Sequence, residues 1–357
     1  MKYGSVSALL ACALLILAAA PATAQNEWTF DGDRLLVTNL IGKVTVKGHD
    51  GSRIVVRASP GGDDAGVLDY QVKQGGSAEF HVVYPLAESQ SYSYPRRRGG
   101  STDFRVENWT DESSFLEDIY SDVSGRERIR IRDNGDVEAW TDLEVLVPRG
   151  VETRVVIAVG EIEATDVQAG VDLDTHSGAV EATNIQGDTR IDTGSGSVVA
   201  RQIRGDLNID TGSGRVEAAD VEGDDILIDT GSGSVTIDGA RARSLNVDTG
   251  SGSVKTSEIF ADNSVIDTGS GSVTLDLMQM SGGSHVVDTG SGSVTVNLPS
   301  DASVRIIADT GSGGIDLNVP NAMLRKMSRN YVELEIGGGD ARLEIDTGSG
   351  GVTINTR

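Results

Sequence analysis

The sequence predicts an all-β protein built as a parallel β-solenoid, also called a β-helix, on three observations. The first is a motif, Asp-Thr-Gly-Ser-Gly, that occurs eight times, beginning at Asp192, Asp210, Asp229, Asp248, Asp267, Asp288, Asp309 and Asp346. The second is its spacing, which is 18 to 21 residues between Asp192 and Asp309. The third is an alternation of apolar and polar residues on both sides of each motif. A fixed period of this length is typical of repeat architectures.

One repeat reads as two short strands joined by a glycine-rich turn. Leu207 and Ile209 alternate with polar residues before the motif at Asp210, and Val216 and Ala218 alternate with polar residues after it. A period of two predicts strands with one buried face. The Gly-Ser-Gly segment between the strands permits a sharp change of direction. Each repeat is therefore expected to form one coil.

Stacking of coils follows from energetics. One coil buries about five aliphatic side chains worth about 1.5–3 kcal/mol each, whereas ordering its backbone costs about 1–2 kcal/mol per residue. Neighbouring coils must supply the difference through parallel strand pairing and stacked aliphatic rows. Parallel crossovers are nearly always right-handed. We therefore expect a right-handed β-solenoid with coils of about 18–21 residues, preceded by an irregular β-rich N-terminal part.

Composition divides the chain into four regions. Residues 1–24 read as a signal peptide, and residues 25–86 as N-terminal β-strands with an imperfect first coil near 39–46. Residues 87–135 lose the period and are predicted to be an inserted, partly disordered loop. Residues 136–357 form the β-solenoid array with a C-terminal cap. Within the cap, Met323, Leu324 and Met327 have helix-like spacing, which predicts a short amphipathic segment over 320–330.

The signal peptide predicts export to the periplasm, the cell surface or the medium. Its apolar run from Ala8 to Ala20 is followed by Ala22-Thr23-Ala24, a small-residue cleavage site. A lipoprotein box ending at Cys12 is the alternative, although it would leave only an apolar stub before the cut. No second apolar run follows, so no transmembrane segment is predicted.

Charge and cysteine content exclude several classes of partner and site. Removing residues 1–24 takes away one lysine and the only cysteine, and it moves the net charge from −24 to −25. Nucleic acid and anionic lipid are poor partners for so acidic a chain. Without a cysteine the mature protein forms neither disulfides nor thiolate metal sites.

The repeated aspartates are the first candidate site. Coil stacking places them above one another, about 4.8 Å apart, where two carboxylates repel by roughly 1 kcal/mol in water. The preferred interpretation is that each accepts hydrogen bonds from its own Gly-Ser-Gly turn. The alternative is a ladder of Ca²⁺ sites formed by Asp192, Asp210, Asp229, Asp248, Asp267, Asp288 and Asp309. The calcium-roll nonapeptide is absent, which favours the turn.

A second candidate lies in the segment that interrupts the repeat. Tyr92 and Tyr94 precede the basic run Arg96, Arg97 and Arg98. On an acidic protein, these residues offer an aromatic and basic contact patch for a partner. The simpler interpretation is a solvated loop, because short charge clusters are usually that.

No catalytic residue and no cofactor is predicted. Asp-Thr-Gly-Ser is also found in pepsin-like proteases, but those enzymes need two facing loops, whereas every copy here occupies the same corner of its coil. A polysaccharide-cleaving β-helix enzyme is the stronger enzymatic alternative, although the array lacks aromatic sugar platforms. His49, His81, His176 and His285 have no ligand spacing and are expected at turns or on the surface.

The chain resembles a known family in its signal peptide, in residues 39–46, in its Asp-Thr-Gly-Ser-Gly-Ser-Val repeats and in its last Gly-Gly-Gly-Asp-Ala-Arg-Leu-Glu-Ile-Asp-Thr-Gly-Ser-Gly segment. These features are similar to the bacterial domain-of-unknown-function family labelled "putative adhesin". The resemblance implies a β-solenoid and an exported location, and it carries over no catalytic or binding residues. We therefore expect an exported, non-enzymatic solenoid that interacts with a protein or glycan of the cell envelope or surface. A periplasmic scaffold without an external ligand is the first alternative, and a carbohydrate-active enzyme is the second.

Overall fold

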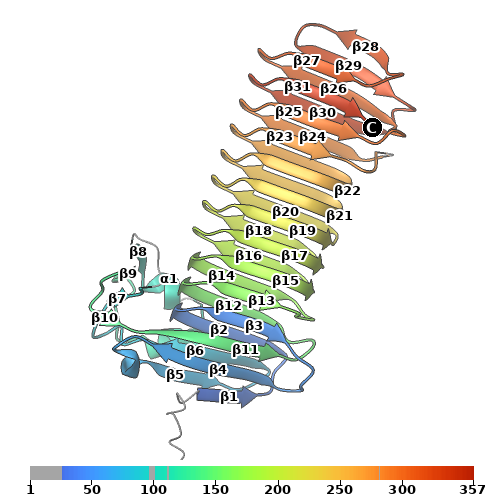
Figure 1. Cartoon of the computed structure of the whole chain (residues 1–357). Coiled ribbons are helices and arrows are strands. Elements are labelled where there is room, and N and C mark those ends of the chain that lie inside the picture. Colours follow the sequence, from blue (N-terminus) through green and yellow to red (C-terminus); the bar gives the residue numbers. More distant parts are fainter. Residues whose placement is uncertain (1–25, 96–100, 111, 281) are drawn as a thin grey trace, which may run out of the picture.

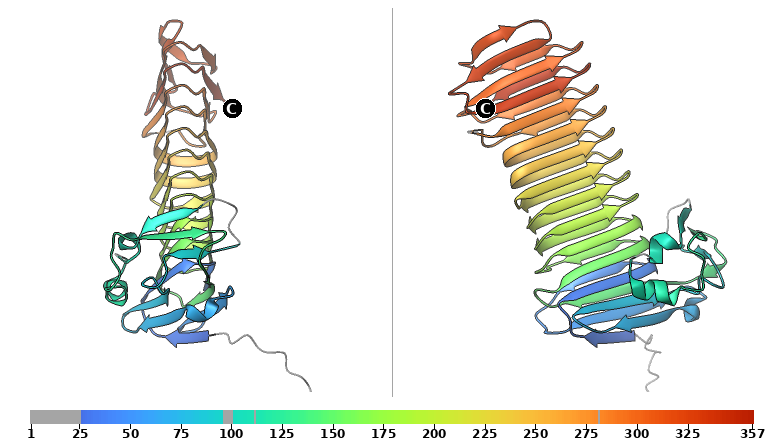
Figure 2. Two further views of the ribbon diagram at one scale, coloured as in Figure 1. Left: turned by 90° about the vertical axis from the view of Figure 1, so that its left-hand side faces the viewer. Right: turned by 180° about the vertical axis from the view of Figure 1, so that it is seen from behind.

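The chain folds into a long, flattened rod of stacked coils (Figure 1). The computed structural model describes residues 26–95, 101–110, 112–280 and 282–357, so the predicted signal peptide lies outside the described residues. Seen along its edge, the rod is narrow, with two rows of strands facing each other (Figure 2). The rows belong to a mostly parallel sheet of 27 strands. This confirms the all-β class and the parallel stacking of the repeats.

Row 1 contains the strands that run into the Asp-Thr motif. From the N-terminal end of the rod to the C-terminal end, its members are β5 (Asp69–Lys73), β6 (Ser77–Val83), β2 (Arg34–Ile41), β12 (Glu152–Val159), β14 (Val171–Ser177), β16 (Thr189–Thr193), β18 (Leu207–Thr211), β20 (Asp225–Thr230), the second halves of β21 (Val235–Thr249) and β22 (Val254–Thr268), β24 (Ser284–Thr289), β30 (Ala341–Thr347), β26 (Val304–Thr310), β29 (Tyr331–Ile336) and β28 (Met323–Met327).

Row 2 contains the strands that follow the motif and return in the opposite direction. Its members are β1 (Asn26–Phe30), β4 (Ile54–Gly61), β11 (Trp140–Val147), β3 (Val44–Gly48), β13 (Ile162–Thr165), β15 (Val180–Gln186), β17 (Val198–Arg204), β19 (Val216–Glu222), the first halves of β21 and β22, β23 (Val273–Asp276), β25 (Val294–Leu298), β31 (Val352–Thr356) and β27 (Ile315–Asn318).

The rows stack in the register that the motif predicts. In β18 and β20, Ile209 lies beside Ile228 and Asp210 lies beside Asp229. The aliphatic residues of both rows are buried between them, because alternate side chains of a strand point to opposite faces. The imperfect first coil is confirmed as well, since β2 and β3 pair in parallel with β12 and β13.

The turn of the motif is held by its threonine and not, as expected, by its aspartate. Thr249 is buried, and its Oγ1 accepts a hydrogen bond from Gly252 N at 3.0 Å and donates one to Gly233 O of the preceding coil at 3.1 Å. The same pair of bonds recurs at Thr230, Thr268, Thr289, Thr310 and Thr347. One hydroxyl therefore closes its own turn and ties it to the coil below, while the aspartate points outward.

The last motif copy does not continue the array. Asp346 pairs with Asp288 on one side and with Asp309 on the other. The strands β30 and β31 are therefore inserted between the coil of β24 and β25 and the coil of β26 and β27. The wide sequence gap before Asp346 arises because the chain builds the outer coil first and then returns to fill the space beneath it.

The helix-like segment expected over 320–330 is instead a strand. β28 pairs antiparallel with β29, which pairs antiparallel with β26. Spacing of three and four residues also arises in a strand that contains a bulge, and β28 has a register shift between Leu324 and Lys326. This hairpin forms the C-terminal end of row 1.

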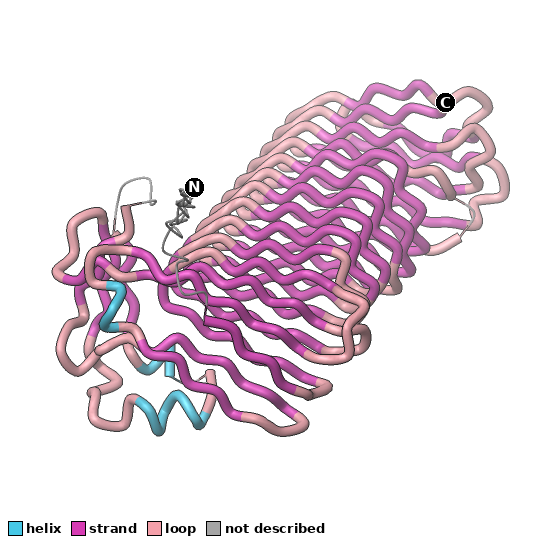
Figure 3. Tube along the Cα trace, turned by 60° about the horizontal axis from the view of Figure 1, so that its bottom comes forward, coloured by secondary structure: helices cyan, strands magenta, loops and turns pink. Residues whose placement is uncertain are grey.

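Residues 84–139, which we call the insertion, form a small lobe beside the N-terminal half of the rod. Its four-stranded sheet has the order β10 (Val137–Glu138), β7 (Ser91–Ser93), β9 (Arg128–Arg132) and β8 (Thr102–Arg105). It also holds α1 (Glu107–Thr110) and α2 (Ser114–Ile119), whereas a 3-10 turn, η1 (Ala65–Val67), precedes β5. The helices are confined to the N-terminal part of the rod (Figure 3). The described part of this segment is therefore more ordered than the long loop that its composition predicted.

Candidate interaction site

The insertion covers the outer face of the row 1 strands β2 and β12 along their second halves. At the covered end, β2 is buried on both faces, from Val37 to Ile41, whereas at the other end Arg34 and Leu36 remain accessible. β12 has the same pattern, with Val155 to Val159 buried. In β2 and β12, the first halves of the strands therefore remain accessible to a partner.

A buried polar network lies beneath the insertion. Thr38 Oγ1 is 2.8 Å from Nδ1 of His81, and His81 Nε2 is 3.1 Å from Oε2 of Glu79. Because the Glu79 carboxylate only accepts, Nε2 carries the proton and Nδ1 accepts from Thr38. Ser113 Oγ also donates to Glu79 at 2.5 Å, and Lys73 Nζ donates at 2.6 Å. The network therefore ties the insertion to row 1.

The order hydroxyl, imidazole, carboxylate in this network is that of a hydrolytic triad, but burial prevents such a reaction. Thr38 and His81 are fully buried, and the ring of Phe115 in α2 packs against His81. Burial lowers the pKa of His81, against the opposing effect of Glu79. For Glu79, burial acts to raise the pKa, but hydrogen bonds from Lys73 and Ser113 outweigh it and lower the value. The network is therefore a structural link.

The expectation that the histidines lie at turns or on the surface is wrong for His81 and for His285. Both are fully buried in row 1, where His285 Nδ1 is 2.9 Å from Ser264 Oγ. Burial lowers the pKa of His285 to about 4. His285 lies on the inward, apolar side of the period-two pattern of its strand, which is a signal that sequence reasoning missed. His81 lies on the outer, polar side with Thr38 and is buried because the insertion covers it.

A tyrosine anchors the insertion from inside. Tyr84 is buried, its hydroxyl lies 3.0 Å from Oδ1 of Asn39, and it accepts from Ile41 N at 3.2 Å. Tyr120, which follows α2, accepts a hydrogen bond from Tyr84 N at 2.9 Å. Burial raises the pKa of both phenols. The lobe is thus fixed to the rod.

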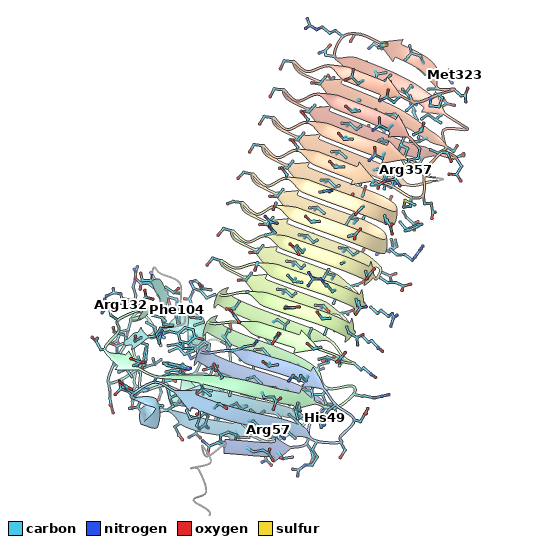
Figure 4. All side chains as sticks on the ribbon, in the orientation of Figure 1. His49, Arg57, Phe104, Arg132, Met323 and Arg357 are labelled. Carbon is cyan, nitrogen blue, oxygen red and sulfur yellow. The ribbon has the colours of Figure 1, made fainter. Side chains whose placement is uncertain are left out.

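The degenerate motif copy at Asp174 marks the place where the insertion meets the repeat. His176 replaces the first glycine of the motif, and its ring lies 5.7 Å from the ring of Phe104 in β8. Figure 4 shows Phe104 and Arg132 on this lobe, at the side of the rod. Burial raises the pKa of Asp174 to about 7, with further contributions from Asp192 and Glu112. The motif therefore departs from its consensus at the copy whose third residue, His176, contacts Phe104 of the insertion.

A groove of about 870 Å³ runs over the accessible halves of the row 1 strands. Its lining includes Arg34, Leu36, Arg154, Asp172, Arg190 and Leu227. Leu227 is 38% exposed and occupies an outward position that Asn208 holds in the preceding coil. An apolar residue at a polar position of the repeat is the sequence signal that could have revealed this groove.

Charges of both signs alternate across the groove. Arg154 is paired with Glu112 of the insertion at 2.6 Å and with Asp172 at 3.5 Å, and Asp172 also lies 3.9 Å from Arg190. Arg34 and Glu152 pair at 3.3 Å along the groove's edge. The pairs of Arg34 with Glu152 and of Arg190 with Asp172 are solvent-exposed, so each contributes about 0–1 kcal/mol to stability, whereas the pair of Arg154 with Glu112 is partly buried. The exposed side chains can therefore exchange partners with a ligand at little cost.

The predicted aromatic and basic patch has a different placement. Tyr92 and Tyr94 are buried inside the insertion, where Tyr92 packs edge-on against Tyr84 and Tyr94 packs against Trp140. Their rings are core residues of the lobe because its small sheet has few other large apolar side chains. Both tyrosines are thus removed from an exposed contact surface. Arg96, Arg97 and Arg98 lie outside the described residues.

The aspartate ladder exists as a geometric feature. Row 1 pairing continues the column from Asp174 through Asp192 to Asp288, then through Asp346 to Asp309. Burial and neighbouring aspartates raise the pKa of Asp192, Asp229 and Asp288. Among the residues that the structure describes, no group of three or more His, Cys, Asp or Glu side chains could hold a metal ion.

We expect calcium removal to leave the fold unchanged. Each coil contributes one aspartate to the column, whereas Ca²⁺ prefers six to eight oxygen ligands. Adding a chelator to the mature chain should therefore shift the melting midpoint by less than about 1 °C, because a ligand stabilises only when it binds the folded state. Thermal melting with chelator and with added Ca²⁺ checks this. A clear rise of the midpoint with Ca²⁺ would restore the calcium interpretation.

Comparisons with known proteins bear on the repeat array. Residues 200–355 match the family described as Toastrack DUF4097, which confirms the resemblance to a family of unknown function over this part of the chain. Among solved structures, the chain is similar to a "putative cell adhesion protein" from Clostridium sporogenes ATCC 15579, at 13% identity and a TM-score of 0.18, over 93% of this chain and 100% of that chain. No curated protein is similar to the sequence. No helix among the described residues is long and apolar enough to cross a membrane.

Proposed function

Because residues 200–355 form a Toastrack DUF4097 domain, we propose that the chain is an exported, non-enzymatic β-solenoid that binds a partner at the cell envelope or cell surface. The signal peptide supports export. The preference of parallel crossovers supports right-handed winding of the coils. In this proposal the rod presents its groove to the partner and does no chemistry.

The composition of the groove is the observation that supports binding. It combines the exposed Leu227 with alternating arginine and carboxylate side chains, which is the mixture of apolar contact and polar pairing found at protein interfaces. None of the groove's lining residues is aromatic, whereas sugar rings usually stack on aromatic side chains. A protein segment therefore fits the groove better than a glycan.

The scaffold alternative differs in what the outer face does. A scaffold needs only stacked coils, and single outward apolar residues such as Leu227 and Val265 are compatible with it. The arginine and carboxylate side chains gathered around Leu227 in one groove are what favour binding. The carbohydrate-active enzyme requires two carboxyl groups about 5–9.5 Å apart across a sugar. In the groove, the carboxylate of Asp172 is paired with Arg154 at 3.5 Å and with Arg190 at 3.9 Å.

Binding should depend on the groove. Labelled mature chain, residues 25–357, is expected to bind intact cells or isolated envelopes. The double variant Leu227→Asp with Arg190→Glu should reduce this binding at least about tenfold, because it removes the apolar contact and reverses one charge. Saturation binding measured by fluorescence checks this.

The matched control is Val265→Asp, which alters an apolar residue of row 1 that is 44% exposed and lies outside the groove. It should leave binding unchanged. Equal binding by both variants would remove the groove from the proposal. Absence of binding by the native chain would favour the scaffold, and release of reducing ends from a glycan panel would favour the enzyme.

A further inference from the structure

The two rows of strands end at different positions along the axis of the rod. At the C-terminal end of the rod, the last strand of row 2 is β27, which lies level with β26 of row 1. Row 1 continues beyond β26 by two more strands, β29 and β28. Figure 1 shows these strands at the outer end of the rod. Row 1 therefore overhangs row 2 by two strands.

The overhang leaves apolar side chains uncovered on its inner face. In the register of β28 and β29, Leu324 lies opposite Leu334 and Met327 lies opposite Val332. Cross-strand neighbours share a face of the sheet, and Leu334 and Val332 are buried in the core. Leu324 and Met327 therefore face the core side too, yet they are 52% and 57% exposed.

Two strand edges are also free at this end. Among the described residues, β27 pairs only with β31, and β28 pairs only with β29. Ile315 and Leu317 of β27 are half-buried on the core side. A free edge offers unpaired backbone groups to another strand. Such an edge beside uncovered apolar side chains needs a partner that supplies strands.

We propose that a second copy of this chain supplies them, through a two-fold symmetric joint between the C-terminal ends of two rods. Row 2 lacks two strands, and the overhang of a second copy offers two. A rotation of 180° about an axis parallel to the strands, midway between the rows, places the second copy's row 1 in line with the first copy's row 2. The two extra strands of each copy then occupy the space beyond β27 of the other copy, which makes the interface self-complementary.

Strand directions and charges agree with this joint. β28 runs parallel to β26, because β29 is antiparallel to both, and β27 runs the opposite way in row 2. The rotation preserves strand directions, so β28 of one copy meets β27 of the other as an antiparallel pair. Lys326 lies on the outer face of β28 beside Glu333, and Asp316 lies on the outer face of β27, so this pairing brings Lys326 near Asp316 of the second copy. A pairing of β28 with β28 of the second copy would instead bring basic residues of both chains together.

Sedimentation of the mature chain over a concentration series tests the joint. The native chain should reach twice its own mass. Leu324→Glu combined with Met327→Glu should remain at the mass of one chain, because four carboxylates would enter the shared core. Val265→Glu, at a similarly exposed apolar residue of row 1, should still pair. Circular dichroism and melting confirm that each variant is folded.

A charge exchange tests the register. Asp316→Lys should weaken pairing by about tenfold, and the added change Lys326→Asp should restore it, because opposite charges face each other again. The mature chain has no cysteine, so Asp316→Cys with Lys326→Cys in one chain provides a clean cross-link. Covalent dimers are expected under oxidising conditions.

Other outcomes would overturn the joint. Mass of one chain at every concentration excludes it, and assemblies that grow without limit indicate a contact between opposite ends of the rod. A single-chain mass combined with sedimentation on anionic vesicles would assign the apolar end to a lipid surface. Persistent pairing of the variant with Leu324→Glu and Met327→Glu would place the dimer contact elsewhere.

Discussion

Gly252→Ala is expected to lower the free energy of unfolding by at least about 3 kcal/mol, the size of effect reserved for backbone strain and severe overpacking. A Cβ at Gly252 would lie 1.7 Å from the carbonyl oxygen of Gly233 in the coil below and 2.8 Å from Thr249 Oγ1. Thr249 closes the turn that contains Gly252, and its hydroxyl donates to Gly233 O of the coil below. The clash is with backbone, so no rotamer change relieves it.

Denaturant unfolding followed by circular dichroism measures this loss. Gly314→Ala is the matched control, because a Cβ there meets no atom within 4 Å, and it should change the midpoint little. Since coils interact mainly with their neighbours, the Gly252→Ala protein should also unfold less cooperatively. Native-like unfolding of this variant would mean that the coil spacing adjusts freely at the turn.

The second large effect is the contribution of Asp174 alone, which stabilises the folded chain as the pH falls from about 7.5 to about 5. Burial beside the insertion raises the pKa of Asp174 to about 7, whereas an unfolded aspartate has a pKa of about 3.9. Between these values the folded state binds the proton and the unfolded state does not, so stability decreases as pH rises. Up to ~4 kcal/mol would be lost by full ionisation, and partial exposure reduces this to about 1–3 kcal/mol.

The variant Asp174→Asn should raise the melting midpoint at pH 7.5 and remove the gain in stability that Asp174 gives the native chain as the pH falls. Asp309→Asn, at the ladder position farthest from the insertion, should keep the native slope and serves as the control. The difference between the native and variant melting curves from pH 5 to 7.5 isolates Asp174, because the buried His81 and His285, whose pKa values are lowered, destabilise both proteins alike below about pH 6.5. A native slope in Asp174→Asn would assign the pH dependence to another group.

The repeat array could be predicted because its physics is local and periodic. Leu207 and Ile209 specify a buried face, the glycines specify a turn, and equal spacing places Asp210 beside Asp229. The side chain that hydrogen-bonds the backbone of the turn could not be predicted in the same way. Asp and Thr both bond to turn backbones, and only the coil below, which supplies the carbonyl of Gly233 to Thr249, decides between them.

The candidate site was less predictable because it depends on contacts between distant segments. Tyr92 and Tyr94 look like an exposed patch beside a basic run, but the insertion needs its own core and takes both rings. In the sequence, His176 is only a substitution of a motif glycine, and its contact with Phe104 becomes visible in the fold. Leu227 carried a usable signal, since it breaks the polar pattern of its row at a position that Asn208 keeps.

The insertion of β30 and β31 between two earlier coils also determines when this rod can be completed. The strands β26 and β27 do not pair with β24 and β25, because β30 and β31, the last strands of the chain, lie between them. A chain that emerges from its N-terminus can stack the coils from β12 to β25 as they appear, but its outer coil must wait for residues 341–357. A chain truncated before Ala341 therefore has a vacant slot within its own stack.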